Sequence, residues 1–405
     1  MQTSRRRVVA LATTAVLSLS SLTAAPAPAE AYTNPSQSSS SQSSSDKRRT
    51  YFYEISQLPF IATGILRLLT GVLGLPGFHL INIGQFFQEI PENFPYPVDT
   101  SITEVKLLSR EVANYPRSQE RRLERWTVAS PSMGRNIAVD VRLPKPDSEP
   151  APTLVMLDGV EAPLHSGWLN ERSGNDFDRV LGEENVTVVF PLDANGTWYS
   201  DWINDDPQLG RQKWETFITK ELLPLSESQA DINANGKRAI GGLSMGATGA
   251  VQTANLHPDL FNATFGISGC YSTMSPLGRQ TMQVVPQSRG ADPKNMWGRH
   301  GSAEWLRHDV ERNPEGLRNQ AVYLSTATGS LLLDQYYADT PIESLSVGWA
   351  LETGTYQCTR DLEKSMKRAG MNHQQVNYRD RGTHNWETFR VELEPAWNHI
   401  KPALY

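Results

Sequence analysis

The sequence is poor in cysteine, with only Cys270 and Cys358 among 405 residues. Structural zinc sites in proteins take four ligands, most of them cysteine or histidine, so two cysteines argue against such a site. An even pair in an exported protein is typical of one disulfide, and the alternative is two unrelated buried thiols. We therefore predict one disulfide, no metal site and no cofactor.

Long blocks of a single charge are also missing. The formal net charge is -6 at pH 7, and no extended basic segment occurs. Nucleic-acid-binding domains carry clustered lysine and arginine, so the sequence indicates no nucleic-acid partner. With 39% hydrophobic residues, a chain of this length can bury the core of one large α/β domain with extensions.

The first 31 residues have the three parts of an export signal. Arg5, Arg6 and Arg7 precede a small and apolar stretch from Val8 to Leu22, and Ala29-Glu30-Ala31 has the form of a cleavage site. The alternative is a retained membrane anchor, but the apolar stretch is shorter than the ~20 residues that a span needs. We predict a signal peptide over residues 1–31 and a secreted or cell-envelope location.

Two segments separate this signal from the catalytic part. Residues 32–50 are rich in serine and glutamine, which predicts a flexible linker. Residues 51–105 form an apolar extension whose stretch 58–78 carries a broad helical stripe. This stripe could pack on the catalytic domain, lie at a membrane surface or cover an acyl chain. A membrane span is disfavoured because Arg67 near its middle costs roughly 2.5–3.5 kcal/mol.

Residues 106–405 alternate short strands with helix-like segments, which is typical of an α/β fold. Continuous apolar runs predict a mostly parallel central sheet with helices on both faces. The predicted strands are 124–129, 136–143, 152–157, 186–191, 238–241, 263–268, 320–325 and 375–378.

A G-x-S-x-G pentapeptide, Gly242 to Gly246, follows one of these strands and precedes the helix-like segment 247–257. A serine on a tight strand-to-helix turn projects its hydroxyl above the sheet, and the flanking glycines let the backbone pass closely. The helix N-terminus favours developing negative charge. The pattern predicts Ser244 as a nucleophile, and the alternative is a glycine-rich turn with a solvent-exposed serine.

A serine nucleophile needs a base, and in this motif the order along the chain is serine, acid, histidine. His384 meets the requirement because it follows the last predicted strand in a loop that contains Gly382. The acid stays open from spacing alone. The candidates between the preceding strand and His384 are Asp334, Asp339, Glu343 and Glu352.

An oxyanion hole requires two backbone N–H groups, one from the residue after the nucleophile and one from the loop after an early strand. Met245 supplies the first. Asp158-Gly159-Val160 directly follows the strand 152–157, so Val160 is the predicted second donor. A simple turn at a strand end is the alternative, since Asp-Gly is common in turns.

Several blocks together resemble the mycolyltransferase family, the antigen 85 proteins and their corynebacterial relatives. The resemblance runs from about Gly134 to Trp386. It rests on Leu157-Asp158-Gly159, Trp198-Tyr199-Ser200-Asp201-Trp202, Lys213-Trp214-Glu215-Thr216-Phe217, Gly242-Leu243-Ser244-Met245, Asn295-Met296-Trp297-Gly298 and Gly382-Thr383-His384-Asn385-Trp386.

The resemblance implies an α/β-hydrolase fold and assigns the acid to Glu352. It places Val160 and Met245 in the oxyanion hole, Asp158 on a sugar hydroxyl and Trp386 in the wall of the acceptor site. The implied reaction transfers a mycoloyl chain from trehalose monomycolate to trehalose or another cell-envelope hydroxyl. The implied partners are trehalose mycolates and cell-envelope glycans.

One position departs from the family, which usually has arginine where this chain has Glu161. A modified acceptor specificity would follow if this side chain contacts the sugar. A secreted carboxylesterase and a catalytically weak envelope-binding homologue are the alternative functions. Cys358 lies six positions beyond Glu352, and we hypothesise that its bond to Cys270 holds Glu352 in register with His384.

Overall fold

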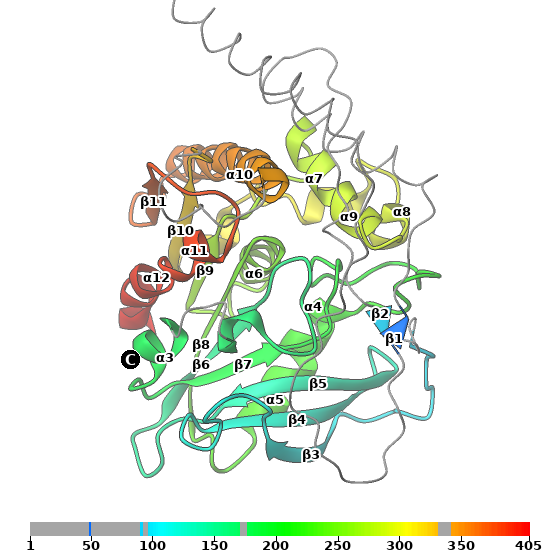
Figure 1. Cartoon of the computed structure of the whole chain (residues 1–405), viewed down its shortest axis with the longest axis vertical. Helices are drawn as coiled ribbons and strands as arrows, with labels where there is room; N and C mark the ends of the chain where they lie inside the picture. The colour runs from blue at the N-terminus through cyan, green and yellow to red at the C-terminus, as the bar shows by residue number, and fades with distance from the viewer. Residues whose placement is uncertain (1–47, 50–89, 92–95, 171–175, 331–341) are drawn as a thin grey trace, which may run out of the picture. The chain divides into compact units, whose positions relative to one another are not determined.

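A mixed sheet of nine strands occupies the centre of the structure, with the order β11-β10-β9-β8-β6-β7-β5-β4-β3 (Figure 1). The strands from β7 to β11 in this order pair in parallel, whereas β3, β4 and β5 form an antiparallel edge. The strand bounds are β3 Lys106–Val112, β4 Leu123–Ser130, β5 Arg135–Arg142, β6 Ala151–Leu157, β7 Thr187–Pro191, β8 Ala234–Leu243, β9 Ala263–Ile267, β10 Ala321–Ala327 and β11 Gln375–Arg379.

This computed structural model describes residues 48–49, 90–91, 96–170, 176–330 and 342–405. The predicted signal peptide 1–31 and the apolar stretch 58–78 lie outside the described residues. So does the predicted linker 32–50 apart from Arg48–Arg49 (β1), which pairs with Ile90–Pro91 (β2) as a two-stranded ladder.

The prediction of eight strands is confirmed, each within a few residues of its observed bounds. The strand that the pattern missed is β3, an edge strand in which exposed and half-buried residues do not alternate cleanly. Such a strand lacks the apolar run or the strict alternation by which strands are recognised. The predicted fold class, a mostly parallel sheet with helices on both faces, is also confirmed.

Helices connect the strands on both sides of the sheet. Their bounds are α3 Asp176–Leu181, α4 Trp214–Thr216, a π-helical turn Phe217–Leu222, α5 Leu223–Glu227, α6 Met245–Leu256, α7 Pro276–Gln287, α8 Pro293–Trp297, α9 Ala303–Arg307, α10 Ile342–Arg368, α11 Trp386–Arg390 and α12 Leu393–Ile400, with 3-10 turns at Gly167–Leu169, Glu315–Leu317 and Lys401–Ala403.

The core has two hydrophobic layers, one on each face of the sheet. Along β6 the side chains alternate, so Val155 and Leu157 enter the layer shared with α6 and α10, while Leu154 and Met156 enter the layer shared with α3 and α12. Every residue of β6 is buried. A strand covered on both faces explains the continuous apolar sequence and holds its carboxyl end rigidly. The residues after these strand ends carry the site described below.

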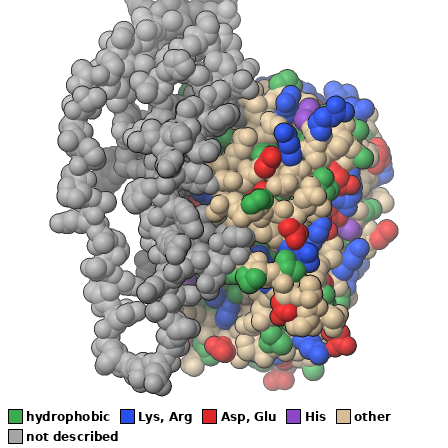
Figure 2. Space-filling model, turned by 90° about the vertical axis from the view of Figure 1, so that its right-hand side faces the viewer, with side chains coloured by type: hydrophobic (Ala, Val, Ile, Leu, Met, Phe, Trp, Pro, Cys, Tyr) green, Lys and Arg blue, Asp and Glu red, His purple; other side chains and the backbone are tan. Residues whose placement is uncertain are grey.

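The surface of the described part mixes both charge signs. Figure 2 shows lysine and arginine side chains interspersed with aspartate and glutamate over the face that is visible. Within the described residues, no helix combines the length and hydrophobicity required to cross a membrane.

Candidate active site

Ser244 lies at the junction between β8 and α6, where the backbone is strained. Its φ of 53° and ψ of -119° are rarely adopted by residues with a side chain. A Cβ on Gly242 would come within 2.6 Å of the Gly246 carbonyl carbon and 2.7 Å of Leu157 O, so that position admits only glycine. The Ser244 N–H donates to Ile267 O at 2.8 Å, which ties the turn to β9.

His384 reaches the serine from the loop between β11 and α11. Its Nε2 lies 2.7 Å from Ser244 Oγ, and its backbone N–H donates to Gly348 O at 3.0 Å. Gly382 has a φ of 138°, and a Cβ there would lie 2.7 Å from Thr388 Oγ1. Glycine therefore permits the turn that brings the imidazole over the nucleophile.

Glu352 on α10 completes the contact on the other side of the ring. Its Oε2 lies 2.8 Å from His384 Nδ1, and its side chain is fully buried. The opposite oxygen, Oε1, accepts from Ser268 Oγ at 2.7 Å, Thr326 Oγ1 at 3.1 Å and the Ala327 N–H at 2.7 Å. Four donors therefore hold the carboxylate in one orientation.

The other acid candidates are not brought to the histidine by anything that the structure describes. Asp334, Asp339 and the side chain of Glu343 lie outside the described residues.

These contacts determine which ring nitrogen of His384 carries the hydrogen. A buried carboxylate that accepts three donors on Oε1 is an acceptor toward Nδ1 as well, so Nδ1 carries the hydrogen and Nε2 presents its lone pair to the Ser244 hydroxyl. This arrangement can remove the serine proton as the oxygen attacks a carbonyl carbon. It is the geometry of covalent acyl chemistry.

The turn after β6 faces the nucleophile. A Cβ on Gly159 would lie 3.5 Å from Ser244 Cβ, and the Gly159 carbonyl accepts from the Ala162 N–H at 3.0 Å. That hydrogen bond fixes the peptide group to which the Val160 N–H belongs. Neither the Val160 N–H nor the Met245 N–H has an acceptor among the residues that the structure describes. Both are available to an oxyanion beside Ser244.

Asp158 is buried directly beside this turn. Its Oδ1 accepts from the Gly167 N–H at 3.0 Å, and Oδ2 has no hydrogen-bond partner within the described residues. The pKa of Asp158 is raised to about 7, with burial as the largest cause, the charges of Asp140 and Glu161 adding to the rise and hydrogen bonds opposing it. A carboxyl group with this pKa exists in both protonation states near neutral pH.

The predicted acceptor-site residues lie around Asp158. A Cβ on Gly167 would collide with the Trp386 ring, so this glycine lets the indole lie against the backbone next to Asp158. Trp386 meets Trp168 edge to face, with 5.4 Å between ring centroids. Glu161 is exposed on the same turn and is close enough for its charge to act on Asp158.

The two cysteines form a disulfide, Cys270–Cys358. Cys270 lies two residues after Ser268, and Cys358 lies on α10 beyond Glu352. The covalent bond therefore joins the segment that donates to the acid with the helix that carries the acid. Among the described residues, no group of three or more His, Cys, Asp or Glu side chains could hold a metal ion.

Sequence reasoning missed the supports of the site. Ser268 and Thr326 donate to Glu352, and no motif marks either residue. Ser268 directly follows β9 and Thr326 lies near the carboxyl end of β10, the two strands that come after β8 in the sheet order. The carboxyl ends of parallel strands are the position where ligand-binding residues gather. Strand-end position could therefore have identified them, although it could not have assigned their partner.

Comparison with known proteins identifies the family. A family described as putative esterase matches residues 130–400. The chain is 29% identical to the diacylglycerol acyltransferase/mycolyltransferase Ag85A of Mycobacterium leprae over 292 residues, which cover 70% of this chain and 82% of that protein. It is 30% identical to Ag85B of Mycolicibacterium smegmatis over 295 residues, with 70% and 85% covered.

Two solved structures share the fold. MPT51 (FbpC1) of Mycobacterium tuberculosis superposes with a TM-score of 0.56 at 22% identity, covering 73% of this chain and 99% of that chain. An S-formylglutathione hydrolase from Agrobacterium tumefaciens superposes with a TM-score of 0.51 at 17% identity, covering 74% and 98%.

Proposed function

The chain belongs to the putative esterase family and to the Ag85 mycolyltransferases, and from this premise we propose that it carries a mycoloyl or similar long acyl chain from trehalose monomycolate to trehalose or another cell-envelope hydroxyl. The enzyme is an acyltransferase of the serine-hydrolase type. The observation that carries the proposal is the continuous set of hydrogen bonds from Ser244 through His384 to Glu352 at a strand-to-helix turn.

In the first half of the reaction, Ser244 Oγ attacks the ester carbonyl of the donor while its proton passes to His384 Nε2. The Val160 and Met245 N–H groups stabilise the oxyanion, and Glu352 stabilises the imidazolium. The ester bond then breaks, and His384 returns the proton to the departing sugar oxygen. The acyl chain remains on Ser244 as an ester.

In the second half, the acceptor hydroxyl gives its proton to His384 and attacks the acyl-enzyme. A second tetrahedral intermediate collapses, and Ser244 regains its proton as the new ester leaves. Transfer wins over hydrolysis only if the acceptor excludes water from this position.

The acceptor is held beside the nucleophile by Asp158 and Trp386. A sugar hydroxyl can donate to the unpartnered Asp158 Oδ2 when the carboxyl group is ionised, and the half-buried indole supplies a flat wall. Glu161 places a negative charge on the same turn, where the family usually has arginine. We propose that this charge changes acceptor preference.

We also propose that the protein acts outside the cytoplasm. The signal-like residues 1–31 support export, and the apolar stretch 58–78 supports contact with a membrane surface at which long-chain substrates gather.

One assay tests the proposal against plain ester hydrolysis. Purified protein is incubated with trehalose monomycolate, and the released trehalose, free acid and dimycolate are quantified for the wild type, Ser244→Ala and Glu161→Arg. We expect dimycolate from the wild type, none from Ser244→Ala and a changed ratio of products from Glu161→Arg. Release of free acid alone by the wild type would identify a secreted carboxylesterase instead.

A further inference from the structure

The pentapeptide Trp198–Trp202 has no part in the reaction described so far. It lies in the connection between β7 and α4, and two successive residues, Trp198 and Tyr199, have positive φ values of 58° and 52°. The left-handed conformation is strained for any residue with a Cβ, because the Cβ then lies too close to the following carbonyl oxygen. Such a pair persists only where its surroundings hold it, and strain of this kind gathers at functional sites.

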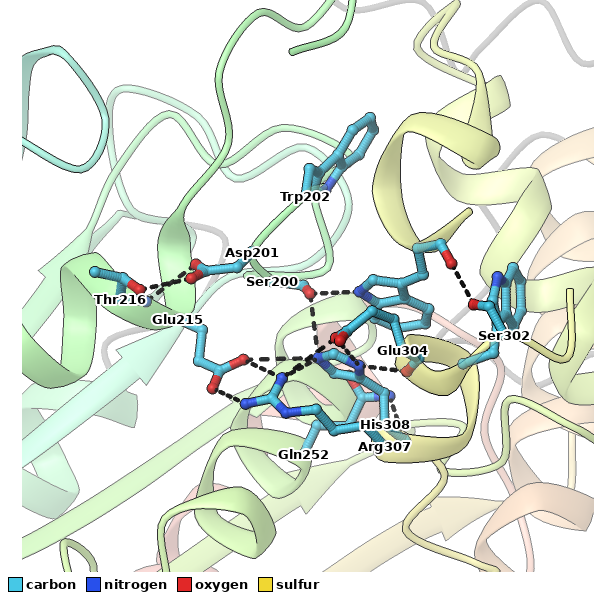
Figure 3. Close-up of polar contacts among 12 residues, drawn as sticks. Ser200, Asp201, Trp202, Glu215, Thr216, Gln252, Ser302, Glu304, Arg307 and His308 are labelled. Atoms are coloured by element: carbon cyan, nitrogen blue, oxygen red, sulfur yellow. Dashed lines mark hydrogen bonds and ion pairs between the residues drawn. The ribbon is translucent and has the colours of Figure 1, made fainter. Parts of the chain in front are cut away.

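Figure 3 shows Ser200 and Asp201, in the second half of the pentapeptide, in polar contact with neighbouring side chains. Ser200 Oγ accepts from Trp297 Nε1 at 2.7 Å and lies 3.4 Å from His308 Nε2. The carboxylate of Asp201 accepts from the Thr216 N–H at 3.0 Å and from its hydroxyl at 2.6 Å. These contacts attach the strained pair to α8, α9 and α4.

The first half packs on the nucleophile helix α6. The Trp198 N–H lies 3.4 Å from Met245 Sδ, and the Trp198 indole N–H donates to Met282 O at 3.1 Å. A Cβ on Gly249 of α6 would come within 2.8 Å of Trp198 O and 3.1 Å of Tyr199 Cβ. Glycine at this position therefore lets the strained pair lie directly against the helix.

Tyr199 delivers its hydroxyl group to the turn after β6. Its Oη accepts from the Asp158 N–H at 3.0 Å, while the Leu157 carbonyl of the same peptide group accepts from Trp168 Nε1 at 3.1 Å. Both ends of this peptide group are thus fixed one residue before Gly159. Burial raises the pKa of Tyr199 well above its usual value, so the phenol stays protonated.

We infer that Tyr199 is a positioning residue for the oxyanion hole, and that the pentapeptide is the frame that holds it. By fixing the Leu157–Asp158 peptide group at the start of the turn, Tyr199 sets where the Val160 N–H lies relative to Ser244. The inference rests on the proposed acyl chemistry and adds a role for a sequence block that this chemistry leaves unused. The alternative is that Tyr199 only stabilises the fold.

Tyr199→Phe tests the inference because it removes the acceptor and keeps the ring. Displacing an oxyanion donor affects the transition state more than the bound substrate, so we expect kcat for a p-nitrophenyl ester to fall about 10- to 100-fold while KM stays within about twofold. Tyr323→Phe is the matched control. Tyr323 is also fully buried, and its hydroxyl donates to Glu392 at 2.6 Å, outside the oxyanion turn.

The control separates positioning from stability. We expect both variants to lower the melting temperature to a similar extent, with kcat for Tyr323→Phe within about twofold of the wild type. Equal kcat in the two variants would overturn the inference. Gly249→Ala provides a second route, since the added methyl group displaces the strained pair from α6, and we expect it to lower kcat about threefold to tenfold with unchanged KM.

Labelling of the wild type distinguishes a failure of this inference from a failure of the proposed function. If an alkyl fluorophosphonate does not label Ser244 of the wild type, the proposed function fails and the inference fails with it. If the wild type is labelled and Tyr199→Phe and Gly249→Ala are labelled at the same rate, the inference alone fails.

Discussion

Two places in the described part of the chain bring together a serine, a histidine and a glutamate. One group is Ser244, His384 and Glu352. The other is Ser200 in the connection between β7 and α4, His308 after α9 and Glu215 on α4.

In the first group, the two ring nitrogens of the histidine contact different residues. His384 meets the serine through Nε2 at 2.7 Å and the glutamate through Nδ1 at 2.8 Å, so the carboxylate supports the nitrogen that is opposite the nucleophile. Ser244 lies at a tight strand-to-helix turn whose close backbone contacts require Gly242 and Gly246.

In the second group, one ring nitrogen of the histidine faces both the serine and the glutamate. His308 turns Nε2 toward both Ser200, at 3.4 Å, and Glu215, at 3.6 Å, while Nδ1 meets the Glu304 carbonyl at 2.7 Å. Glu215 is also bound by Arg307. The three residue types therefore form a catalytic group only when the acid and the serine contact opposite nitrogens of the imidazole ring. The same types otherwise make a structural network.

Serine replacement gives the largest expected difference between the two groups. Ser244→Ala should lower kcat for a p-nitrophenyl ester by about 10⁴-fold or more, because the covalent step is lost. Ser200→Ala should lower it by no more than about tenfold, because it disturbs only the anchor of the pentapeptide. Steady-state kinetics of the two variants measures this difference. Comparable losses of kcat in the two variants would contradict the assignment of Ser244 as the nucleophile.

Replacement of the two glutamates comes next. Glu352→Gln should lower kcat by about 10³- to 10⁴-fold, since the amide no longer stabilises the imidazolium and can impose the wrong tautomer on His384. Glu215→Gln should leave kcat within about tenfold and lower the melting temperature by several degrees. The measurement is kinetics paired with thermal unfolding, and a catalytic loss without a stability loss in Glu215→Gln would contradict the account.

The disulfide should have a smaller effect, and only on the first group. Replacing both cysteines by serine removes a bond that spans 88 positions and should lower stability by about 4 kcal/mol on the chain-entropy estimate. If the bond also keeps Glu352 in register, kcat should fall several-fold at a temperature where the variant is folded. Unchanged turnover and unchanged unfolding in urea would show that the bond supports neither the fold nor the acid.

The smallest expected effect concerns the pH dependence of stability, because the two regions shift the pKa of a buried carboxyl group in opposite directions. The pKa of Asp158 is raised to about 7 by burial, so the folded chain retains a proton that the unfolded chain releases near pH 4. This contribution to stability is complete below about pH 4 and is lost as the pH rises to 7.

Asp158→Asn removes this dependence on pH. Relative to the wild type, the variant should therefore gain stability between pH 5 and pH 8, by roughly 2–3 kcal/mol. Urea unfolding at both pH values measures the change.

Glu215 should show the opposite sign. Burial opposes its ionisation, but hydrogen bonds from His257, His308 and Arg307 outweigh that effect and hold the pKa of Glu215 far below its usual value. Its contribution is present at neutral pH and is lost on acidification. Glu215→Gln should therefore destabilise the protein at pH 7 more than at pH 2.5, well below the ordinary pKa of glutamate, and equal effects at the two pH values would contradict the assignment.

The sequence predicted those parts of the molecule that depend on local patterns. Strands β6, β7 and β9 are buried along their whole length and carry apolar runs, and the glycines around Ser244 mark a turn that only they allow. The acid stayed open because its identity depends on how α10 packs against β10, and spacing along the chain carries no information about that packing. Resemblance to a known family selected Glu352, which the structure places beside His384.

The supports of the site could not be predicted for a related reason. The contact from Tyr199 to the Asp158 N–H requires two left-handed residues in succession, and neither tryptophan nor tyrosine signals that conformation. The contacts of Ser268 and Thr326 with Glu352 arise only once two strands, β9 and β10, and the helix α10 are assembled.

The most direct test of the central claim is the mass of the acyl-enzyme. The wild type, Ser244→Ala and Ser200→Ala are treated with an alkyl fluorophosphonate or a long-chain acyl ester, digested and analysed by mass spectrometry. We expect one modified peptide, carrying the group on Ser244, in the wild type and in Ser200→Ala, and none in Ser244→Ala. A stoichiometric adduct on another residue, or no adduct on a folded wild-type protein, would contradict it.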